Sequence, residues 1–383
     1  MTQGFMPVRW TLLVVALALA LIAGLRCGGD SGGSGPEIKN YTVSSKDDLA
    51  ELAGISVITG YLKIEGASDL TDLSDLISLT KVGGELKIRY NNALVSLDGL
   101  DNLVSVGSDL TIEADDVLGS LDGLGSLTSV GRYFVIKDCQ SLKSLAGLEH
   151  LTEVKRRLAI TGNDSLATIE GLAGLESVGA LDILGDDALI DLDGLEALEE
   201  ITGWRASGDD YDYSSGLRVG SISVSPGGNA SLASISGLGN LKDVFGDVVI
   251  EGNPSLAEID GLGRLSEIDY LYIAYNQSLA GLDSLRAVTK IGGMSIRYNA
   301  ILTNLAGLEN VADVTQWLSI SRNGALTSLG LGNLEHVGNN FIIQQNPQLS
   351  NDLATALRDQ VFALSGIGGD VIICGNLNGP PCD

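Results

Sequence analysis

Residues 86–107 read LKIRYNNALVSLDGLDNLVSVG, and close copies of this stretch recur along most of the 383-residue chain. The clearest landmark in each copy is a pair of apolar residues separated by one position, which returns every 23–24 residues in most copies. A near-constant period of this size predicts a solenoid, in which successive repeats stack as coils. The pairs are Leu62/Ile64, Leu86/Ile88, Leu110/Ile112, Phe134/Ile136, Leu158/Ile160, Leu181/Ile183, Ile222/Val224, Val248/Ile250, Leu271/Ile273, Met294/Ile296, Leu318/Ile320, Phe341/Ile343 and Val371/Ile373.

The alternation inside each pair predicts a short strand with two side chains pointing inward and one pointing outward. The motifs SLxGL, at residues 96–100, and LxxVG, at residues 103–107, add further apolar positions and corner glycines, so each coil has about three short faces. One coil cannot bury its own apolar residues, but stacked neighbours bury them continuously. We therefore expect a mainly β protein, a parallel β-solenoid of about thirteen coils.

A polar residue follows the second member of most pairs by three positions, so stacking would align these residues into a ladder. Aligned amides and carboxylates can bind a cation or a sugar. Alternatively, each side chain hydrogen-bonds backbone groups that a buried corner would leave unpaired, and we favour this second interpretation. The residues are Asn91, Asn163, Asn253, Asn276, Asn299, Asn323, Asn346 and Asn376, with Asp115, Asp186 and a small buried thiol, Cys139, in the same slot.

The charge of the chain excludes one class of partner. There are 49 acidic and 23 basic residues, which give a net charge of −26. A surface of this sign repels phosphate backbones, so we do not expect nucleic acid as a partner. The sequence also indicates no cofactor and no metal site.

The first forty residues indicate export from the cytoplasm. Residues 10–25 form an apolar run that is shorter than the ~20 residues of a transmembrane helix and fits the core of a signal peptide. We assign residues 1–26 to a signal peptide and residues 27–39, which contain GGDSGGSGP, to a flexible Gly/Ser tether.

Cys27, directly after the apolar run, resembles the lipidated cysteine of bacterial lipoproteins, although Arg26 stands where that family has a small residue. The resemblance implies a lipid anchor on Cys27 and a position outside the cytoplasm, at the outer membrane or cell surface. Cleavage after Ala20 or Ala23 would instead give a secreted or periplasmic protein.

The composite pattern GLxxLxxVGGxLxIxxNxxLxSLxGL resembles the receptor L-domain repeat, which occurs in the ectodomains of the insulin and epidermal growth factor receptors and in bacterial surface proteins. Residues 41–66 are similar to the usual start of that family, where a first strand leads into a capping helix, here with Ser45 as its N-cap. The resemblance covers about residues 41–377 and implies a right-handed parallel solenoid related to leucine-rich repeats. We assign residues 40–383 to this domain, with an insertion at 203–220 and a C-terminal cap at 351–383.

The C-terminal cap contains two further expectations. Residues 351–364 have helical spacing at Leu353, Leu357, Val361 and Leu364, which predicts a helix that covers the exposed end of the last coil. Beyond this helix, Cys374 and Cys382 are expected to form a disulfide in an oxidising compartment.

Two groups of residues are candidates for ligand binding. Trp204, Tyr211 and Tyr213 lie on the predicted insertion, and aromatic side chains on a loop held by a rigid scaffold often form binding sites. Tyr275, Tyr298 and Arg322 occupy the same slot of three consecutive coils and should form a row. A solvated insertion and ordinary surface tyrosines are the simpler interpretations.

The sequence does not favour catalysis. His150 and His336 belong to coils about seven apart, so at ~4.8 Å per coil they are ~34 Å apart and cannot share one catalytic or zinc site within a chain. We expect a non-enzymatic cell-surface lipoprotein whose solenoid presents a protein- or glycan-binding surface. A structural spacer of the cell envelope and, more remotely, a carboxylate-only glycoside hydrolase are the alternatives.

Overall fold

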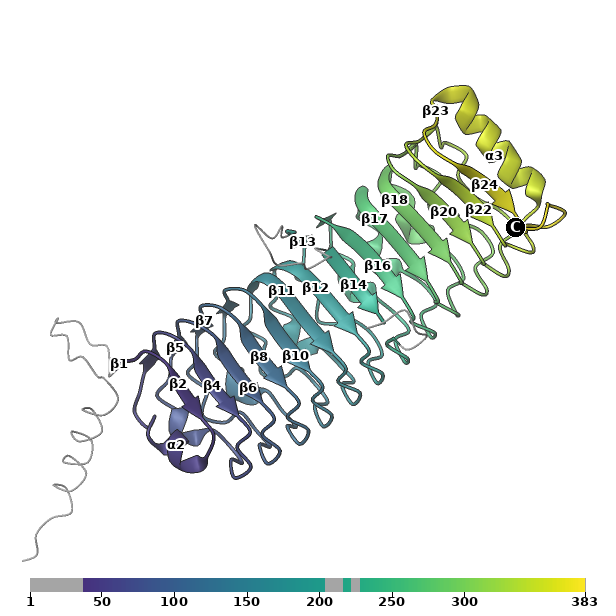
Figure 1. Cartoon of the computed structure of the whole chain (residues 1–383). Helices are drawn as coiled ribbons and strands as arrows, with labels where there is room; N and C mark the ends of the chain where they lie inside the picture. Colours follow the sequence, from purple (N-terminus) through teal and green to yellow (C-terminus); the bar gives the residue numbers. More distant parts are fainter. Residues whose placement is uncertain (1–36, 204–215, 222–227, 383) are drawn as a thin grey trace, which may run out of the picture.

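The computed structural model describes residues 37–203, 216–221 and 228–382 and shows a parallel β-solenoid of about 12 turns with few helices (Figure 1). This architecture confirms the prediction from the repeat. Equivalent strands of successive coils pair in parallel, for example β4 (Leu62–Glu65) with β6 (Leu86–Arg89), where Leu62 lies opposite Leu86 and Ile64 opposite Ile88. A repeat of constant length therefore places like residues on top of one another along the solenoid.

One strand of each coil contributes to a face that we call the broad face. Its strands are β2 (Tyr41–Val43), β4, β6, β8 (Leu110–Glu113), β10 (Phe134–Lys137), β11 (Glu153–Thr161), β12 (Ser177–Leu184), β14 (Gly216–Gly220), β16 (Asp247–Glu251), β17 (Glu267–Ala274), β18 (Lys290–Arg297), β20 (Leu318–Ser321), β22 (Phe341–Gln344) and β24 (Val371–Cys374).

Two-residue strands precede the broad face in most coils. They are β1 (Glu37–Ile38), β3 (Val57–Ile58), β5 (Lys81–Val82), β7 (Ser105–Val106), β9 (Ser129–Val130), β13 (Glu200–Ile201), β15 (Asp243–Val244), β19 (Asp313–Val314), β21 (His336–Val337) and β23 (Gly366–Ile367). In β11, β12, β17 and β18 the two strands of the coil are continuous.

Short helical turns close several coils on the side away from these strands. The 3-10 helices are η1 (Ser74–Leu76), η2 (Asp122–Leu124), η3 (Glu170–Leu172), η4 (Ser236–Leu238), η5 (Asp260–Leu262) and η6 (Asp283–Ala287). No helix within the described ranges is long and apolar enough to cross a membrane.

The core is a continuous column of mainly Leu, Ile and Val side chains that runs from Ile38 to Val361. In the coils between the two ends, the two inward residues of the broad-face strand are buried, as for Leu86 and Ile88, whereas Tyr41, Val371 and Ile373 of the end coils are partly buried. Because each coil covers the next, this burial depends on neighbouring coils, as expected of a repeat protein.

The predicted insertion requires a correction. The strand of this coil is β14, in which Leu217 and Val219 lie opposite Leu181 and Ile183. The expected pair Ile222/Val224 is therefore wrong, and the last five residues of the proposed insertion at 203–220 belong to the sheet. The stretch GLRVGSISV offers two alternating apolar pairs, and the spacing rule selected the second because extra residues lie on both sides of the true strand.

The N-terminal end confirms one expectation and corrects another. Helix α2 (Lys46–Ala50) begins after Ser45, whose hydroxyl accepts a hydrogen bond from the backbone N–H of Asp48, so the predicted N-cap is confirmed. The proposed tether at 27–39 is too long at its C-terminal end, because Glu37 and Ile38 form β1 and pair with β3. Ile38 is buried, which fixes these residues to the first coil.

The C-terminal end is covered by α3 (Asn351–Leu364), which matches the predicted helix (Figure 1). Its buried residues are Ala354, Leu357 and Val361, whereas Leu353 and Leu364 are exposed, so two of the four expected inward positions are wrong. The helix packs at an angle that substitutes Ala354 for Leu353 on its inner side.

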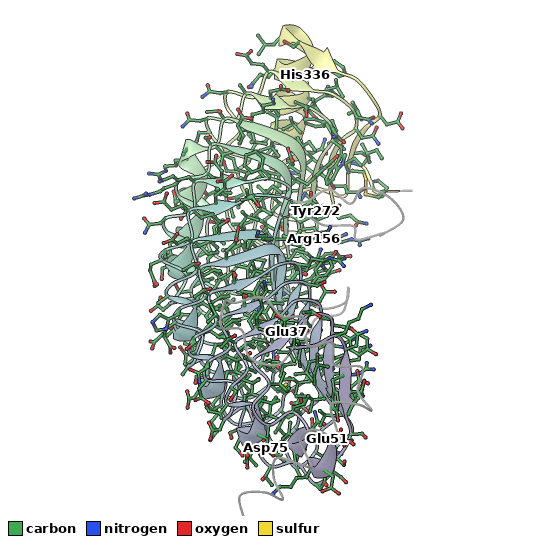
Figure 2. The ribbon with its side chains drawn as sticks, turned by 90° about the vertical axis from the view of Figure 1, so that its left-hand side faces the viewer. Glu37, Glu51, Asp75, Arg156, Tyr272 and His336 are labelled. Carbon is green, nitrogen blue, oxygen red and sulfur yellow. A yellow bond between two sulfur atoms is a disulfide. The ribbon has the colours of Figure 1, made fainter. Side chains whose placement is uncertain are left out.

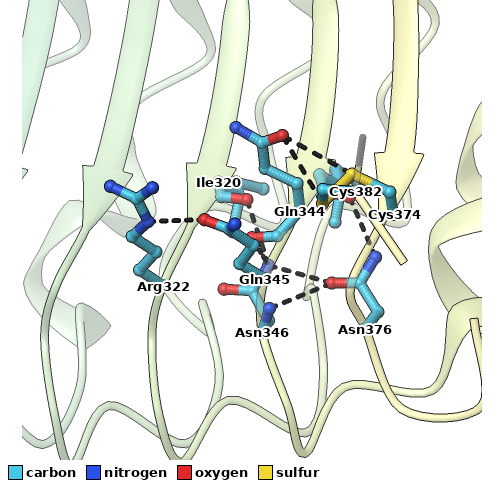
Figure 3. Close-up of a disulfide and its surroundings, with 9 residues drawn as sticks. Ile320, Arg322, Gln344, Gln345, Asn346, Cys374, Asn376 and Cys382 are labelled. Atoms are coloured by element: carbon cyan, nitrogen blue, oxygen red, sulfur yellow. Dashed lines mark hydrogen bonds between the residues drawn. A yellow bond between two sulfur atoms is a disulfide. The ribbon is translucent and has the colours of Figure 1, made fainter. Parts of the chain in front are cut away.

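The expected disulfide between Cys374 and Cys382 is formed, and it lies beside Gln344 of the preceding coil (Figure 3). It ties the segment after β24 to the last strand of the sheet. The proposed signal peptide at 1–26, Cys27 and the aromatic residues Trp204, Tyr211 and Tyr213 lie outside the described residues.

Candidate functional site

The Asn ladder is buried and serves the backbone. The Oδ1 atom of Asn299 accepts a hydrogen bond from the backbone N–H of Asn276 at 3.2 Å, and its Nδ2 group donates to the carbonyl of Ile273 at 3.0 Å. Asn346 and Asn376 repeat this arrangement at the C-terminal end (Figure 3). Because Asn276, Asn299 and Asn346 have no exposed surface, the ladder stabilises the corners and offers no accessible ligand site.

One ladder residue was missed. Asn229 is fully buried, accepts a hydrogen bond from the backbone N–H of Asp186 at 2.9 Å and donates to the carbonyl of Ile183 at 3.0 Å. It follows Val219 by ten positions, so the rule of three positions could not find it.

Three ladder positions are chemically different from the rest. Burial raises the pKa of Asp115 to about 6 and that of Asp186 to about 7, although the backbone N–H groups of Asn91 and Asn163 donate to them. Cys139 is a free, fully buried thiol, and burial raises its pKa to about 12. The expectation of a small buried thiol is therefore confirmed.

The predicted row of Tyr275, Tyr298 and Arg322 exists. The two tyrosine rings stack with centroids 4.5 Å apart and an interplanar angle of 10°, and the Arg322 guanidinium lies 5.1 Å from the centre of the Tyr298 ring and donates to its hydroxyl. All three residues have a left-handed backbone, with φ of 56–58°. This conformation costs a non-glycine residue about 1–2 kcal/mol, which the ring contacts offset in part.

The broad face is divided by charge. From β4 to β16 several outward side chains form ion pairs, within one coil for Lys87 with Glu85 at 2.6 Å and between neighbouring coils for Arg89 with Glu65 at 3.2 Å and Arg157 with Asp182 at 2.8 Å. Solvent-accessible pairs such as Arg89 with Glu65 contribute little stability, about 0–1 kcal/mol each, but they keep this part of the face polar. Arg157 and Asp182 form a largely buried pair.

The outward residues between the two inward residues of each strand form the central row of the broad face. From β17 onward this row carries no charged side chain in the described strands. Its residues there are Tyr272, Ser295, Ser319, Ile342 and Ile372. Figure 2 places Tyr272 between Glu51, near the N-terminal end, and His336, near the C-terminal end. A shorter uncharged run, Thr111, Val135 and Ala159, lies on β8, β10 and β11, so the C-terminal run is distinguished by its length and by the aromatic side chains beside it.

Three aromatic side chains gather at the start of this region, and we call Tyr270, Tyr272 and Trp317 the aromatic patch. The Trp317 ring stacks on Tyr270 at 6.3 Å and meets the edge of Tyr272 at 5.6 Å. Between the coils of Tyr270 and Trp317 lies Gly293, where a Cβ atom would come within 2.7 Å of the Tyr270 ring and 2.9 Å of the Trp317 ring. The absence of a side chain at Gly293 allows the two rings to approach each other.

A recess of about 590 Å³ adjoins the aromatic patch. It arises from the lengths of the corners that lead into the broad face. In β17 and β18 one residue, Asp269 or Gly292, joins the two parts of the strand, whereas the coils on either side have two, Phe245 with Gly246 and Thr315 with Gln316. Two short corners between longer neighbours leave a hollow, with Phe245 on one side and Gln316 on the other.

The recess has aromatic and acidic walls. Phe245 and Tyr270 supply the aromatic wall, and Phe245 is 54% exposed. The Tyr270 hydroxyl donates to Oε1 of Gln316 at 2.8 Å, and this hydrogen bond holds the Tyr270 ring at the recess. Glu267, Asp269 and Lys290 also line it. Nearby, the pKa of Asp247 is raised to about 6, first by burial and then by the negative charge of Asp269.

The sequence pattern identified the row of Tyr275, Tyr298 and Arg322 but missed the aromatic patch and the recess. Tyr270 and Tyr272 stand close to Tyr275 in the sequence, but Phe245 and Trp317 are single aromatic residues whose position beside the tyrosines depends on the stacking of coils. The change from two-residue to one-residue corners is the signal that could have located the recess. No group of three or more His, Cys, Asp or Glu side chains in the described part of the chain is arranged to hold a metal ion.

Comparison with known proteins adds little to this description. No protein-family model and no curated protein matches the chain. Among solved structures, a leucine-rich repeat protein from Bacteroides ovatus is similar over 91% of this chain and 97% of its own, with 11% sequence identity and a TM-score of 0.25.

Proposed function

We propose that this chain is a non-enzymatic recognition protein and that the broad face from β17 to β22 is its binding surface. The observation that carries the proposal is the aromatic patch, which lies at the longest uncharged run of the central row, on a face whose ion pairs lie mostly before β17. Binding surfaces are depleted in charge at their centres and enriched in Tyr and Trp. The parallel stacking of coils supplies the rigid scaffold that such a surface needs.

The proposal places the protein outside the cytoplasm, anchored by lipid on Cys27. The apolar run at 10–25 and the Gly/Ser segment after Cys27 support this location. The disulfide between Cys374 and Cys382 supports an oxidising compartment. The intact mass of the protein extracted from its native membrane tests the anchor: a chain that begins at Cys27 with added acyl mass supports it, and an unmodified chain argues for a secreted or periplasmic protein.

The binding function is tested with the exported chain, residues 27–383, immobilised and exposed to a panel of glycans and purified cell-surface proteins. A partner should bind the unaltered chain and be lost from a Tyr272→Ala/Trp317→Ala double variant. Tyr90→Ala is the matched control, because Tyr90 is also exposed but belongs to the charge-paired part of the solenoid.

The spacer alternative makes the opposite prediction in cells. If the protein is a spacer, any envelope defect of a deletion strain should be restored equally by the unaltered chain and by the double variant. If it is a recognition protein, the double variant should fail to restore the phenotype although it reaches the surface in equal amount.

A further inference from the structure

We propose that the recess and the aromatic patch together bind a neutral glycan chain, with one sugar ring in the recess and the following ring on the patch. This inference rests on the proposed recognition function and specifies the class of its ligand. The two features are continuous, because Tyr270 lines the recess and also stacks on Trp317.

The size and the walls of the recess fit a sugar ring. A volume of about 590 Å³ is within the range of small-molecule sites, which lies at about 300–1,000 Å³. Phe245 and Tyr270 present aromatic surface on which the C–H face of a pyranose can pack. This apolar contact leaves the hydroxyl groups at the rim of the sugar ring free for hydrogen bonds.

The polar groups match sugar hydroxyls, each of which donates one hydrogen bond and accepts others. Glu267 and Asp269 supply acceptors, Lys290 supplies donors, and Gln316 supplies both. Mixed donors and acceptors around an aromatic wall suit a ligand that carries several hydroxyl groups on each ring.

The site is organised before a ligand binds. The hydrogen bond from Tyr270 to Gln316 spans two coils and holds the Tyr270 ring, and Gly293 allows Trp317 to lie against it. Tyr270 stands on β17, and Trp317 directly precedes β20. Little side-chain entropy is therefore lost on binding, which favours affinity for a ligand that makes only a few contacts.

Charge selects among the possible partners. An anionic polymer is repelled by Glu267, Asp269 and the net charge of −26. A basic peptide finds carboxylates in the recess but no acidic group in the central row of Tyr272, Ser295 and Ser319, and Lys290 opposes it inside the recess. A neutral chain of hydroxyl-bearing rings is compatible with both parts of the surface.

The chain carries a suitable reporter for the test. Its three tryptophans are Trp10, Trp204 and Trp317, so Trp317 is the single tryptophan of a 27–383 protein with Trp204→Phe. This protein is titrated with the hexasaccharides of cellulose, laminarin, xylan, mannan and amylose, with hexalysine and a polygalacturonate oligosaccharide as charged comparisons. Calorimetry with the unaltered 27–383 chain checks that Trp204→Phe has no effect on binding.

We expect a saturable change in Trp317 fluorescence with at least one neutral hexasaccharide. Phe245→Ala and Ser266→Phe, which places a larger side chain at a residue that lines the recess, should each weaken binding about tenfold or more. Gly293→Val should weaken it similarly by forcing Tyr270 and Trp317 apart, although it removes no contacting group. Tyr90→Ala should leave it unchanged, and the melting temperature of each variant shows that the fold is intact.

Three results would overturn the inference. Failure of every neutral hexasaccharide to bind at about 10 mM, or a response to hexalysine alone, would exclude the neutral glycan. Binding that is unaffected by Phe245→Ala and Ser266→Phe would exclude the recess. In each case the recognition function still stands if a protein partner is lost from the Tyr272→Ala/Trp317→Ala variant. Shortening of the bound oligosaccharide would instead contradict the non-enzymatic assignment.

Discussion

Replacement of Asp186 by Asn should stabilise the protein and remove part of its pH dependence. Asp186 is fully buried in a ladder of asparagines, and its Oδ2 atom has no hydrogen-bond partner among the described residues. The equivalent Nδ2 group of Asn163 donates to the carbonyl of Ile136, so an amide at position 186 should donate to the carbonyl of Ile160. The Oδ1 atom would still accept from the backbone N–H of Asn163.

The magnitude follows from the shift of the pKa. Burial raises the pKa of Asp186 to about 7, whereas an unfolded aspartate has a pKa of about 3.9. Between these values only the folded state binds the proton, so the free energy of unfolding falls as the pH rises through this window. Above pH 7 the ionised carboxylate costs up to about 4 kcal/mol, and Asp186→Asn should recover about 2–4 kcal/mol, which is roughly 3–6 °C in Tm.

The assay is thermal and urea unfolding of Asp186→Asn between pH 4 and pH 8, together with hydrogen exchange of the amides in β11 and β12. Stabilisation should be large at pH 8 and small at pH 4, where the wild-type carboxyl is protonated. The exposed neighbour Asp187→Asn is the matched control and should change stability little at any pH. A variant that is equally or less stable than the wild type at pH 8, or a gain that does not depend on pH, would refute the reasoning.

Three further variants test other parts of the structure. Asn299→Ala should lower the free energy of unfolding by about 2–4 kcal/mol, because it leaves the N–H of Asn276 and the carbonyl of Ile273 buried without partners. The control Asn310→Ala, at an exposed position, should cost under about 1 kcal/mol. Equal losses of the two variants in urea unfolding would contradict the stabilising role of the ladder. Ala114→Gly should stabilise the protein by up to about 1 kcal/mol in thermal unfolding, since Ala114 has a φ of 52°, while Ala300→Gly, at a position outside that region, should give no gain. Cys374→Ser/Cys382→Ser should destabilise the C-terminal end by about 2–3 kcal/mol, seen as faster hydrogen exchange in β24 and α3 with unchanged exchange in β4; unaltered exchange in β24 would show that the disulfide does not hold this end.

The fold was predictable because the repeat imposes the same choice on every coil. One misread strand could be corrected by its neighbours, and only Ile222/Val224 failed, where residues 204–215 and 222–227 break the spacing on both sides of β14. The ends were predictable for local reasons, since Ser45 has the character of an N-cap and residues 351–364 have helical spacing. The rotation of α3 was not, because packing against the last coil decides between Ala354 and Leu353.

The candidate site was less accessible to sequence reasoning. The Tyr275, Tyr298 and Arg322 row followed directly from the period, since like positions stack. The aromatic patch depends on Gly293, because a side chain there would collide with the rings of Tyr270 and Trp317. These two residues belong to the coils before and after Gly293, so their proximity is not visible in the local sequence. The recess depends on two corners that are each one residue shorter than the corners of the neighbouring coils. A search for chemically active side chains does not detect such a difference in length.

The most direct test of the binding surface is hydroxyl-radical footprinting of the exported chain with and without a saturating partner from the binding panel. The account predicts that Tyr270, Tyr272 and Trp317 become protected while Tyr61 and Tyr90, on the charge-paired part of the solenoid, keep their reactivity. Protection of Tyr61 and Tyr90 with an unchanged aromatic patch would contradict it.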